Sequence, residues 1–447
     1  MAKITFLGAG SSVFAKNVLG DCMFKPGLRD AHIALYDIDP KRLRESRLML
    51  NTLNKNVNKG KATITAHHGK AQLRTALKGA DFVVNAIQVG GYKPSTVIDF
   101  EVPKKYGLRQ TIADTLGIGG IFRALRTIPV MMDFASAINK VCPDAWFLNY
   151  TNPMCILTAA LLRHGDVQAV GLCHSVQSCV PGLIGNLGLE KKYPPGEIKW
   201  KIAGINHMAW LLEMSHNGKD IYPEVRKAAA AKNRKARRKN GEKHWDMVRF
   251  EIMRHFGYYV TESSEHNAEY MPYWIKSAAP ELIDELNIPL DEYPRRCIRQ
   301  IEGWEAQRKD IVTNKKLTHA PSHEYGASIM NAIATNEPFG FHGNVMNTGL
   351  IPNLPETACV EVQCVANRAG VHRCHAGVLP EQLAGLNRTN INVQLLTLEA
   401  AMTRRKDAIY HAAMLDPHTA AELTLDQIRS LCDDLIEAHG RMLPTYR

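Results

Sequence analysis

The 447-residue sequence has no apolar run close to the roughly 20 residues that a membrane-spanning helix requires. It also has no charged N-terminal stretch followed by an apolar segment, because MAKITFLGAG leads directly into an expected strand. These two absences predict a chain without a membrane span or a secretory signal, and we expect it to be cytoplasmic. A chain of this length is most often built from two domains that share an interface.

Paired cysteines are absent as well. Ten cysteines are scattered along the chain, and no two of them are spaced as CxxC. In a reducing compartment this predicts free thiols, most of which pack as small apolar residues. The zinc signature HExxH is missing too, so no spacing motif indicates a metal site.

Positive charge is in excess, with a formal net charge of +11, but it is concentrated in one segment. Residues 226–243 contain nine Lys or Arg and one Glu, so 9 − 1 = +8 of the total arises there. A single basic segment without interleaved aromatic residues is typical of a solvated loop or helix face. We therefore expect no nucleic-acid partner.

The chain does contain a regular alternation of expected strands and helices in its first 175 residues. Helical spacing follows the first strand at 11–23 and the second at 39–53. The expected strands are 3–10, 32–39, 80–91, 145–153 and 168–175. This alternation predicts a Rossmann-like, doubly wound parallel sheet. The remainder mixes long helices with short strands, so we predict an α/β domain over 1–175 packed on an α+β domain over 176–447.

The stretch GAGSS, which includes Gly8, Gly10, Ser11 and Ser12, lies between the first strand and its helix. Glycines at this position allow a pyrophosphate to approach the helix N-terminus, where free N–H groups favour anions. The third glycine of the usual fingerprint is missing. Asp37 ends the second strand, where a carboxylate binds a ribose 2′-hydroxyl and repels a 2′-phosphate. The alternative for Asp37 is a helix cap. The sequence predicts NAD rather than NADP.

Polar side chains stand at the carboxyl ends of three later strands. They are Asn85, Asn149, Asn152, Cys173 and His174. In a doubly wound sheet, ligands bind at the carboxyl ends of the strands, so these residues are expected to converge on one crevice. We assign Asn85 and Asn149 to the cofactor side of it.

Cys173 has three interpretations on the residues alone. A nucleophilic thiolate is one, but it leaves the NAD site unexplained. A metal ligand is the second, with His207 in GINHMAW as its partner and open positions for substrate oxygens. The third is a buried core thiol, with His207 as a capping or core histidine.

A set of motifs in chain order resembles glycoside hydrolase family 4, and within it the α-galactosidase branch. The motifs are GAGSS, ALYDIDP, NAIQVGG, QTIADTLGIGGIFRALRTIP, LNYTNPM, GLCHS, GINHMAWLLE, YYVTESSEHNAEYMPY and LDPHTAAEL. They cover nearly the whole chain. CHS resembles the galactosidase type, and TESSEH resembles the galactoside and galacturonide branches. An α-galacturonidase shares several of these motifs and is the main alternative.

The resemblance implies an NAD-dependent route outside the usual two-carboxylate scheme of glycosidases. Bound NAD+ takes a hydride from C3 of the galactosyl ring, which acidifies the C2 proton. A base removes that proton, and the aglycone leaves C1 by elimination. Water then adds, and the hydride returns to C3. The resemblance also implies a divalent ion, most often Mn2+, and a homodimer or homotetramer.

Residue by residue, the resemblance makes Cys173 and His207 the metal ligands. His174 matches the acid for the leaving group or a ligand of a sugar hydroxyl. Tyr270 is the best match to the C2 base, a role that requires a nearby cation to lower its pKa. Its rivals are Tyr258, Tyr259 and Tyr273.

Three further residues are matched to the substrate side. Asn152 matches a substrate-binding asparagine, and Asn149 lies between cofactor and sugar. Arg123 follows the Gly119–Gly120 pair and is expected to bind a sugar oxygen or to steady the carboxylate of Asp114. A malate- or lactate-type dehydrogenase shares this fold and is the less favoured alternative, because the paired substrate arginine and His–Asp base of that class are not evident.

Overall fold

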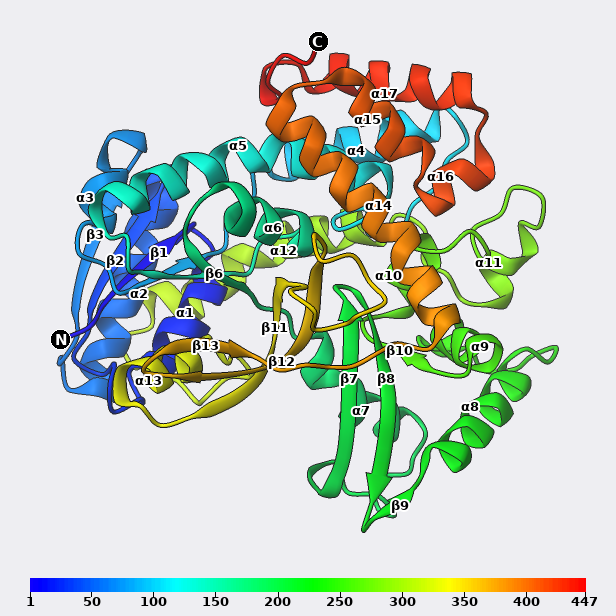
Figure 1. Ribbon diagram of the computed structural model, residues 1–447. Helices are drawn as coiled ribbons and strands as arrows, with labels where there is room; N and C mark the ends of the chain where they lie inside the picture. The colour runs from blue at the N-terminus through cyan, green and yellow to red at the C-terminus, as the bar shows by residue number, and fades with distance from the viewer.

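The computed structural model describes residues 1–447 (Figure 1). Its N-terminal part is a six-stranded parallel sheet in the order β3-β2-β1-β4-β5-β6. The strands are β1 (Lys3–Leu7), β2 (His32–Asp37), β3 (Thr63–His68), β4 (Phe82–Asn85), β5 (Trp146–Asn149) and β6 (Gln168–Gly171). This order and the parallel pairing confirm the predicted Rossmann-like sheet.

The strands end earlier than the sequence pattern suggested. β1 stops at Leu7, so the glycines of GAGSS lie in the turn before α1 (Ser12–Cys22). The strand β3 was not predicted, because TITAHH is short, largely polar and only partly buried at the sheet edge. Figure 1 shows α5 and α6 on one side of the sheet and α1 and α2 on the other. These helices are α2 (Pro40–Asn58), α5 (Gly117–Val141) and α6 (Met154–His164).

The second part extends the same sheet with antiparallel strands, so that one sheet runs through the molecule in the order β10-β8-β7-β12-β11-β6 and onward. The strands are β7 (Ile198–Ile205), β8 (Met208–His216), β9 (Lys219–Asp220), β10 (Tyr259–Val260), β11 (Phe339–Met346), β12 (Cys359–Asn367) and β13 (Gly370–Arg373). One apolar core of 107 buried residues draws on both parts. The domain boundary at 175/176 falls at the start of α7 (Ser175–Asn186) and stays a prediction.

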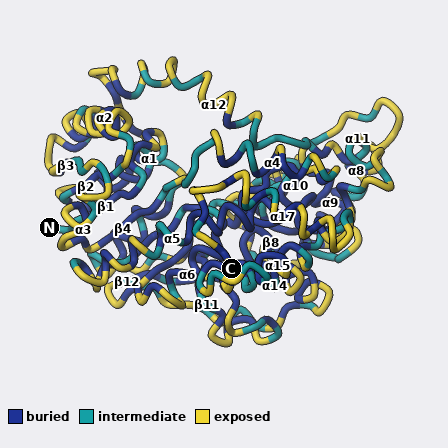
Figure 2. Tube along the Cα trace, turned by 90° about the horizontal axis from the view of Figure 1, so that it is seen from above, coloured by how far each residue is buried: buried dark blue, intermediate teal, exposed yellow.

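Helices surround this second part of the sheet. Figure 1 shows the C-terminal helices crossing α5, whereas Figure 2 shows α12 as a largely exposed helix. Besides α3 (Leu73–Leu77) and α4 (Val97–Lys104), the remaining helices are α8 (Tyr222–Ala236), α9 (Met247–Phe256), α10 (Ser264–Glu269), α11 (Glu281–Glu285), α12 (Glu292–Arg308), α13 (Gly326–Thr335), α14 (Glu381–Thr403), α15 (Lys406–Met414), α16 (Pro417–Glu422) and α17 (Leu425–His439).

The basic segment 226–243 forms the end of α8 and the loop after it, with most of its Lys and Arg side chains exposed. This agrees with the predicted solvated helix face. None of the helices combines the length and apolar character that crossing a bilayer would need.

Candidate active site

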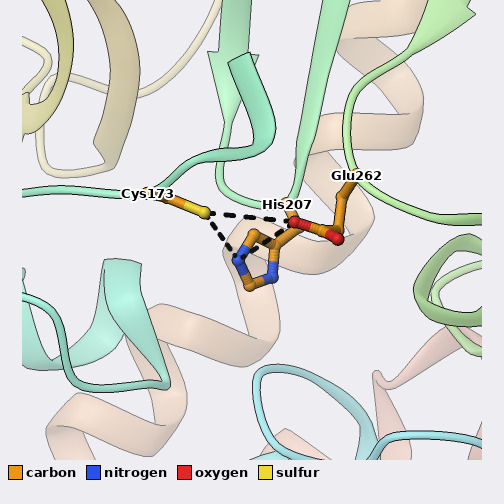
Figure 3. Close-up of side chains that lie close together, drawn as sticks. All are labelled: Cys173, His207 and Glu262. Carbon is orange, nitrogen blue, oxygen red and sulfur yellow. Dashed lines mark hydrogen bonds and ion pairs between the residues drawn. The ribbon is translucent and has the colours of Figure 1, made fainter. Parts of the chain in front are cut away.

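Three potential metal ligands from distant parts of the chain lie together (Figure 3). Cys173 follows β6, His207 lies in the two-residue turn of the β7–β8 hairpin, and Glu262 follows β10. The Cys173 Sγ atom is 3.2 Å from His207 Nε2 and 4.0 Å from Glu262 Oε2. His207 Nε2 is 3.8 Å from the same carboxylate oxygen. The predicted Cys–His pair is therefore brought together, with a carboxylate that the sequence analysis missed.

The electrostatics of this cluster favour a cation. Burial alone would lower the pKa of His207, but the charge of Cys173, its hydrogen bond and Glu262 raise the pKa to about 10. Burial would raise the pKa of Glu262, but the positive charges of His266 and His207 lower it overall. The site thus stabilises positive charge beside the sulfur of Cys173 and the carboxylate of Glu262. This donor set fits a divalent metal ion.

The second ring nitrogen of His207 is close to Tyr270. The distance from His207 Nδ1 to Tyr270 Oη is 3.3 Å. Tyr270 is fully buried, and burial raises the pKa of its hydroxyl well above 10. A partner on the far nitrogen fixes the orientation of a metal-binding histidine. The base role of Tyr270 stays a prediction, and its geometry is that of a residue that holds His207.

His174 lies beside Cys173 but is paired with a different carboxylate. Its Nε2 atom is 2.9 Å from Glu324 Oε2. The hydrogen bond to Glu324 raises the pKa of His174. The His174 side chain is 45% exposed, so it is accessible to a ligand. The neighbouring Tyr325 hydroxyl binds both the N–H and the carbonyl of Cys173, at 2.9 Å each.

The predicted substrate-side residues gather around Asp114. Asn152 donates from Nδ2 to Asp114 Oδ2 at 3.2 Å, and its buried Oδ1 atom has no partner in the protein. His266 Nε2 is 3.7 Å from Asp114 Oδ1. Burial would raise the pKa of Asp114, but His266 and the charge of Arg123 lower it. Arg123 forms no ion pair with Asp114, and instead donates to Tyr293 Oη at 3.3 Å.

The loop that carries Asp114 is held by another buried carboxylate. Glu269 accepts hydrogen bonds from the backbone N–H groups of Thr111, Ile112 and Ala113, at 2.8, 3.2 and 2.8 Å. Burial raises the pKa of Glu269 to about 7. Neither Glu269 nor Glu324 could be found from the sequence, because their partners lie far away in the chain.

The glycine loop between β1 and α1 is closely packed against neighbouring backbone and against Asp37. Gly8 has φ +85°, and a Cβ there would lie 2.6 Å from the Ala86 carbonyl oxygen. Asp37 accepts from the Gly10 N–H at 2.6 Å, whereas Asp39 caps α2, so the alternative of a cap at Asp37 is excluded. Ser11 is exposed at the start of α1.

Three other predicted cofactor residues are buried. Ser12 Oγ lies 2.9 Å from Ser46 Oγ. Asn85 donates to Asn149 Oδ1 at 3.0 Å, and both asparagines are fully buried at the ends of β4 and β5. Their contact with a cofactor stays a prediction, since these hydrogen bonds tie the strand ends to one another.

The fold and the site define an α/β protein whose reactive side chains gather at the carboxyl ends of a Rossmann-like sheet. Sequence comparison places it more narrowly. The family 4 glycosyl hydrolase model matches residues 3–189, and the family 4 glycosyl hydrolase C-terminal domain model matches residues 202–419. The chain belongs to family 4 of the glycosyl hydrolases.

Relatives support this assignment over the full length. The chain is 62% identical to an α-galactosidase of Bacillus subtilis, covering 100% of both proteins. It is 31% identical to an α-galactosidase of Rhizobium meliloti, covering 99% of this chain and 89% of that one. Identity to an α-galacturonidase of Lachnoclostridium phytofermentans is 28%, with 99% and 97% covered.

Solved structures agree with the fold. A putative glucosidase from Bacillus subtilis superposes with a TM-score of 0.86 at 24% identity, covering 97% of this chain and 99% of that one. A 6-phospho-α-glucosidase from gut microorganisms, in complex with NAD and Mn2+, gives 0.79 at 20% identity with 100% of both chains covered.

Proposed function

We propose that the protein is an α-galactosidase that hydrolyses terminal α-galactosides such as melibiose. The reaction would require bound NAD+ and a divalent metal ion, for which we expect Mn2+. The observation that carries this proposal is the Cys173–His207 pair at the carboxyl ends of the sheet, with the carboxylate of Glu262 beside it. The 62% identity to an α-galactosidase supports the substrate class. An α-galacturonidase is the second candidate, and the lower identity of 28% counts against it.

The glycine loop would hold the cofactor. Gly8 and Gly10 allow the loop to pack closely, because a Cβ on Gly8 would lie 2.6 Å from the Ala86 carbonyl oxygen and one on Gly10 would lie 2.8 Å from Asp37 Oδ2. Ser11 and the first N–H groups of α1 would bind the pyrophosphate. The carboxylate of Asp37 favours a free ribose hydroxyl over a 2′-phosphate. NAD+ bound there supplies a hydride acceptor for C3 of the sugar.

Cys173 and His207 would hold the divalent ion, and Tyr270 would fix the His207 ring. A divalent ion at this position acts as a Lewis acid on the C2 and C3 oxygens of the sugar. Asn152 and Arg123 would bind sugar hydroxyl groups. The unpaired Oδ1 of Asn152 supports that assignment, since a buried acceptor without a partner is costly.

Two proton transfers require a side chain: protonation of the leaving oxygen at C1 and removal of the proton at C2. His174 would protonate the leaving oxygen at C1, and Glu324 would hold it protonated and oriented. For the C2 proton we assign Glu262, because its carboxylate is partly exposed, with its side chain 23% accessible. Tyr270, the base that the resemblance indicated, is fully buried and bonded to His207.

The test is hydrolysis of 4-nitrophenyl α-galactoside by protein freed of nicotinamide and metal. Activity should require both NAD+ and Mn2+, and product formed in D2O should carry deuterium at C2. A parallel panel of α-galacturonides, α-glucosides and 6-phospho sugars identifies the substrate class. Cleavage of melibiose at full rate without nicotinamide would refute the proposal.

A cytoplasmic location and a homodimeric or homotetrameric assembly belong to the same proposal. Fractionation of cells and light scattering of the purified chain test them separately from the chemistry.

A further inference from the structure

The parts of the sheet that lead to Cys173 and to His207 are joined by few backbone pairs. We call this junction, in which β11 and β12 lie between β6 and β7, the seam. The hairpin of β11 and β12 lies between β6, which leads to Cys173, and β7, which leads to His207. Eight residue pairs join β11 to β12. By contrast, β11 pairs with β6 only at Asn344–Gly171, and β12 pairs with β7 only at Glu361–Gly204.

The side chains at these two pairing positions are bonded to each other. Asn344 donates from Nδ2 to Glu361 Oε1 at 3.1 Å and contacts the Gly171 carbonyl oxygen at 3.4 Å. Asn206, which precedes His207, donates to Glu361 Oε1 at 3.3 Å and to Oε2 at 3.5 Å. One carboxylate therefore connects the segments that carry Cys173 and His207.

Both partners across the seam are glycines, and the packing requires this. A Cβ on Gly171 would lie 2.9 Å from Asn344 Cβ and 2.6 Å from Met154 Sδ. Gly204 has φ +154°, and a Cβ there would lie 2.7 Å from Ala209 Cα. A side chain at Gly171 would thus collide with Asn344, and a side chain at Gly204 would collide with the neighbouring strand β8.

A carboxylate at this position is costly for stability. Glu361, Asn344 and Asn206 are all fully buried. Burying a carboxylate removes it from water at a large cost, and an apolar residue of similar size is often neutral or stabilising in its place. Burial raises the pKa of Glu361 to about 7, which reflects the same cost. A role beyond packing accounts for the presence of the group.

We propose that Glu361 is a positioning residue for the metal centre, which sets the separation of Cys173 and His207 through its hydrogen bonds to Asn344 and Asn206. This inference rests on the metal site of the proposed function. It assigns to Glu361 no contact with substrate, cofactor or ion. Loss of an outer partner of a metal ligand typically weakens metal binding about 10- to 100-fold.

The experiment measures Co2+ and Mn2+ binding to the purified full-length protein, without substrate. Absorption from the thiolate–Co2+ bond reports on Cys173, provided that Cys173→Ser abolishes it. Glu361→Ala should raise the dissociation constant for both ions about 10- to 100-fold. Glu361→Gln should retain most of the affinity, because the amide oxygen can replace Oε1 as the acceptor for both asparagines.

Asp416→Ala serves as the matched control. Asp416 is also a fully buried carboxylate, but it caps α16 through Thr419 and takes no part in the seam. Asp416→Ala should lower the melting temperature of the protein without changing its affinity for Co2+ or Mn2+. If Glu361→Ala does not fold, Asn206→Ala and Asn344→Ala each remove one link and should each weaken metal binding.

The outcomes separate this inference from the proposed function. Wild-type protein that binds neither ion at Cys173 would overturn the metal site itself. Wild-type binding that is unchanged in folded Glu361→Ala, or in both asparagine variants, would overturn the positioning role alone.

Discussion

Substitution of Tyr270 by phenylalanine separates two roles of one hydroxyl group. The change removes a single oxygen from a fully buried ring, so packing is conserved. The lost contact is the one to His207 Nδ1 at 3.3 Å. If the hydroxyl only holds His207, Mn2+ binding should weaken about tenfold, the lower end of the effect of losing an outer partner of a ligand. At saturating Mn2+, kcat should then change little.

Loss of the general base should lower kcat much more than loss of a residue that only positions His207. General base catalysis contributes about 10²- to 10⁴-fold to the rate. We expect that loss in Glu262→Gln, together with the loss of deuterium incorporation at C2 in D2O. Tyr270→Phe should still incorporate deuterium.

The assays are Mn2+ titration, kcat at saturating Mn2+ and mass spectrometry of the galactose product. The reasoning is refuted if Tyr270→Phe abolishes exchange at C2 while its Mn2+ affinity is unchanged, because Tyr270 would then be the base.

Three other changes test the remaining features. His174→Ala should lose little on substrates with very good leaving groups and much more on melibiose; equal losses on both would remove the acid role. Gly8→Ala should weaken NAD+ binding, measured by fluorescence titration, because its Cβ would lie 2.6 Å from the Ala86 carbonyl oxygen; Gly60→Ala, at φ +73° in open space, is the control and should bind NAD+ normally. Burial lowers the pKa of His342 from 6.5 to about 4. The unfolded chain therefore takes up the proton first, and His342 should cost the wild type at most about 2 kcal/mol of unfolding free energy between about pH 7 and pH 5. His342→Gln should lack this loss in urea titrations, and an equal pH dependence in both proteins would contradict the assignment.

The parallel sheet could be predicted because each strand is a short apolar run followed by turn residues or a helical pattern. Strand β3 escaped prediction, because an edge strand with few buried residues lacks that signal. The glycine loop and the proximity of Cys173 and His207 could also be predicted from the sequence, because glycine, cysteine and histidine at strand ends indicate a binding site.

The carboxylates of the site could not be predicted from the sequence in this way. Glu262 is 89 residues from Cys173 in sequence, and Glu324 is 150 residues from His174. The spacing of apolar residues along one segment cannot predict a contact between residues so far apart in the chain. Glu361 is one of three polar residues in β12, and only the arrangement of β6, β7, β11 and β12 shows which segments it joins. The burial of Tyr270 and its contact with His207 depend on the packing of distant segments, and its role as the base stays a prediction.

The sparse seam has a mechanical consequence. A boundary with one backbone pair on each side should resist twisting less than a full ladder, so a relative rotation of the two parts of the sheet would be concentrated where β6 and β7 flank the hairpin. An ion bound by Cys173 on one part and His207 on the other would cross-link them at that boundary. Loading the ion should therefore stiffen the whole enzyme, and its departure should loosen regions far from the sugar.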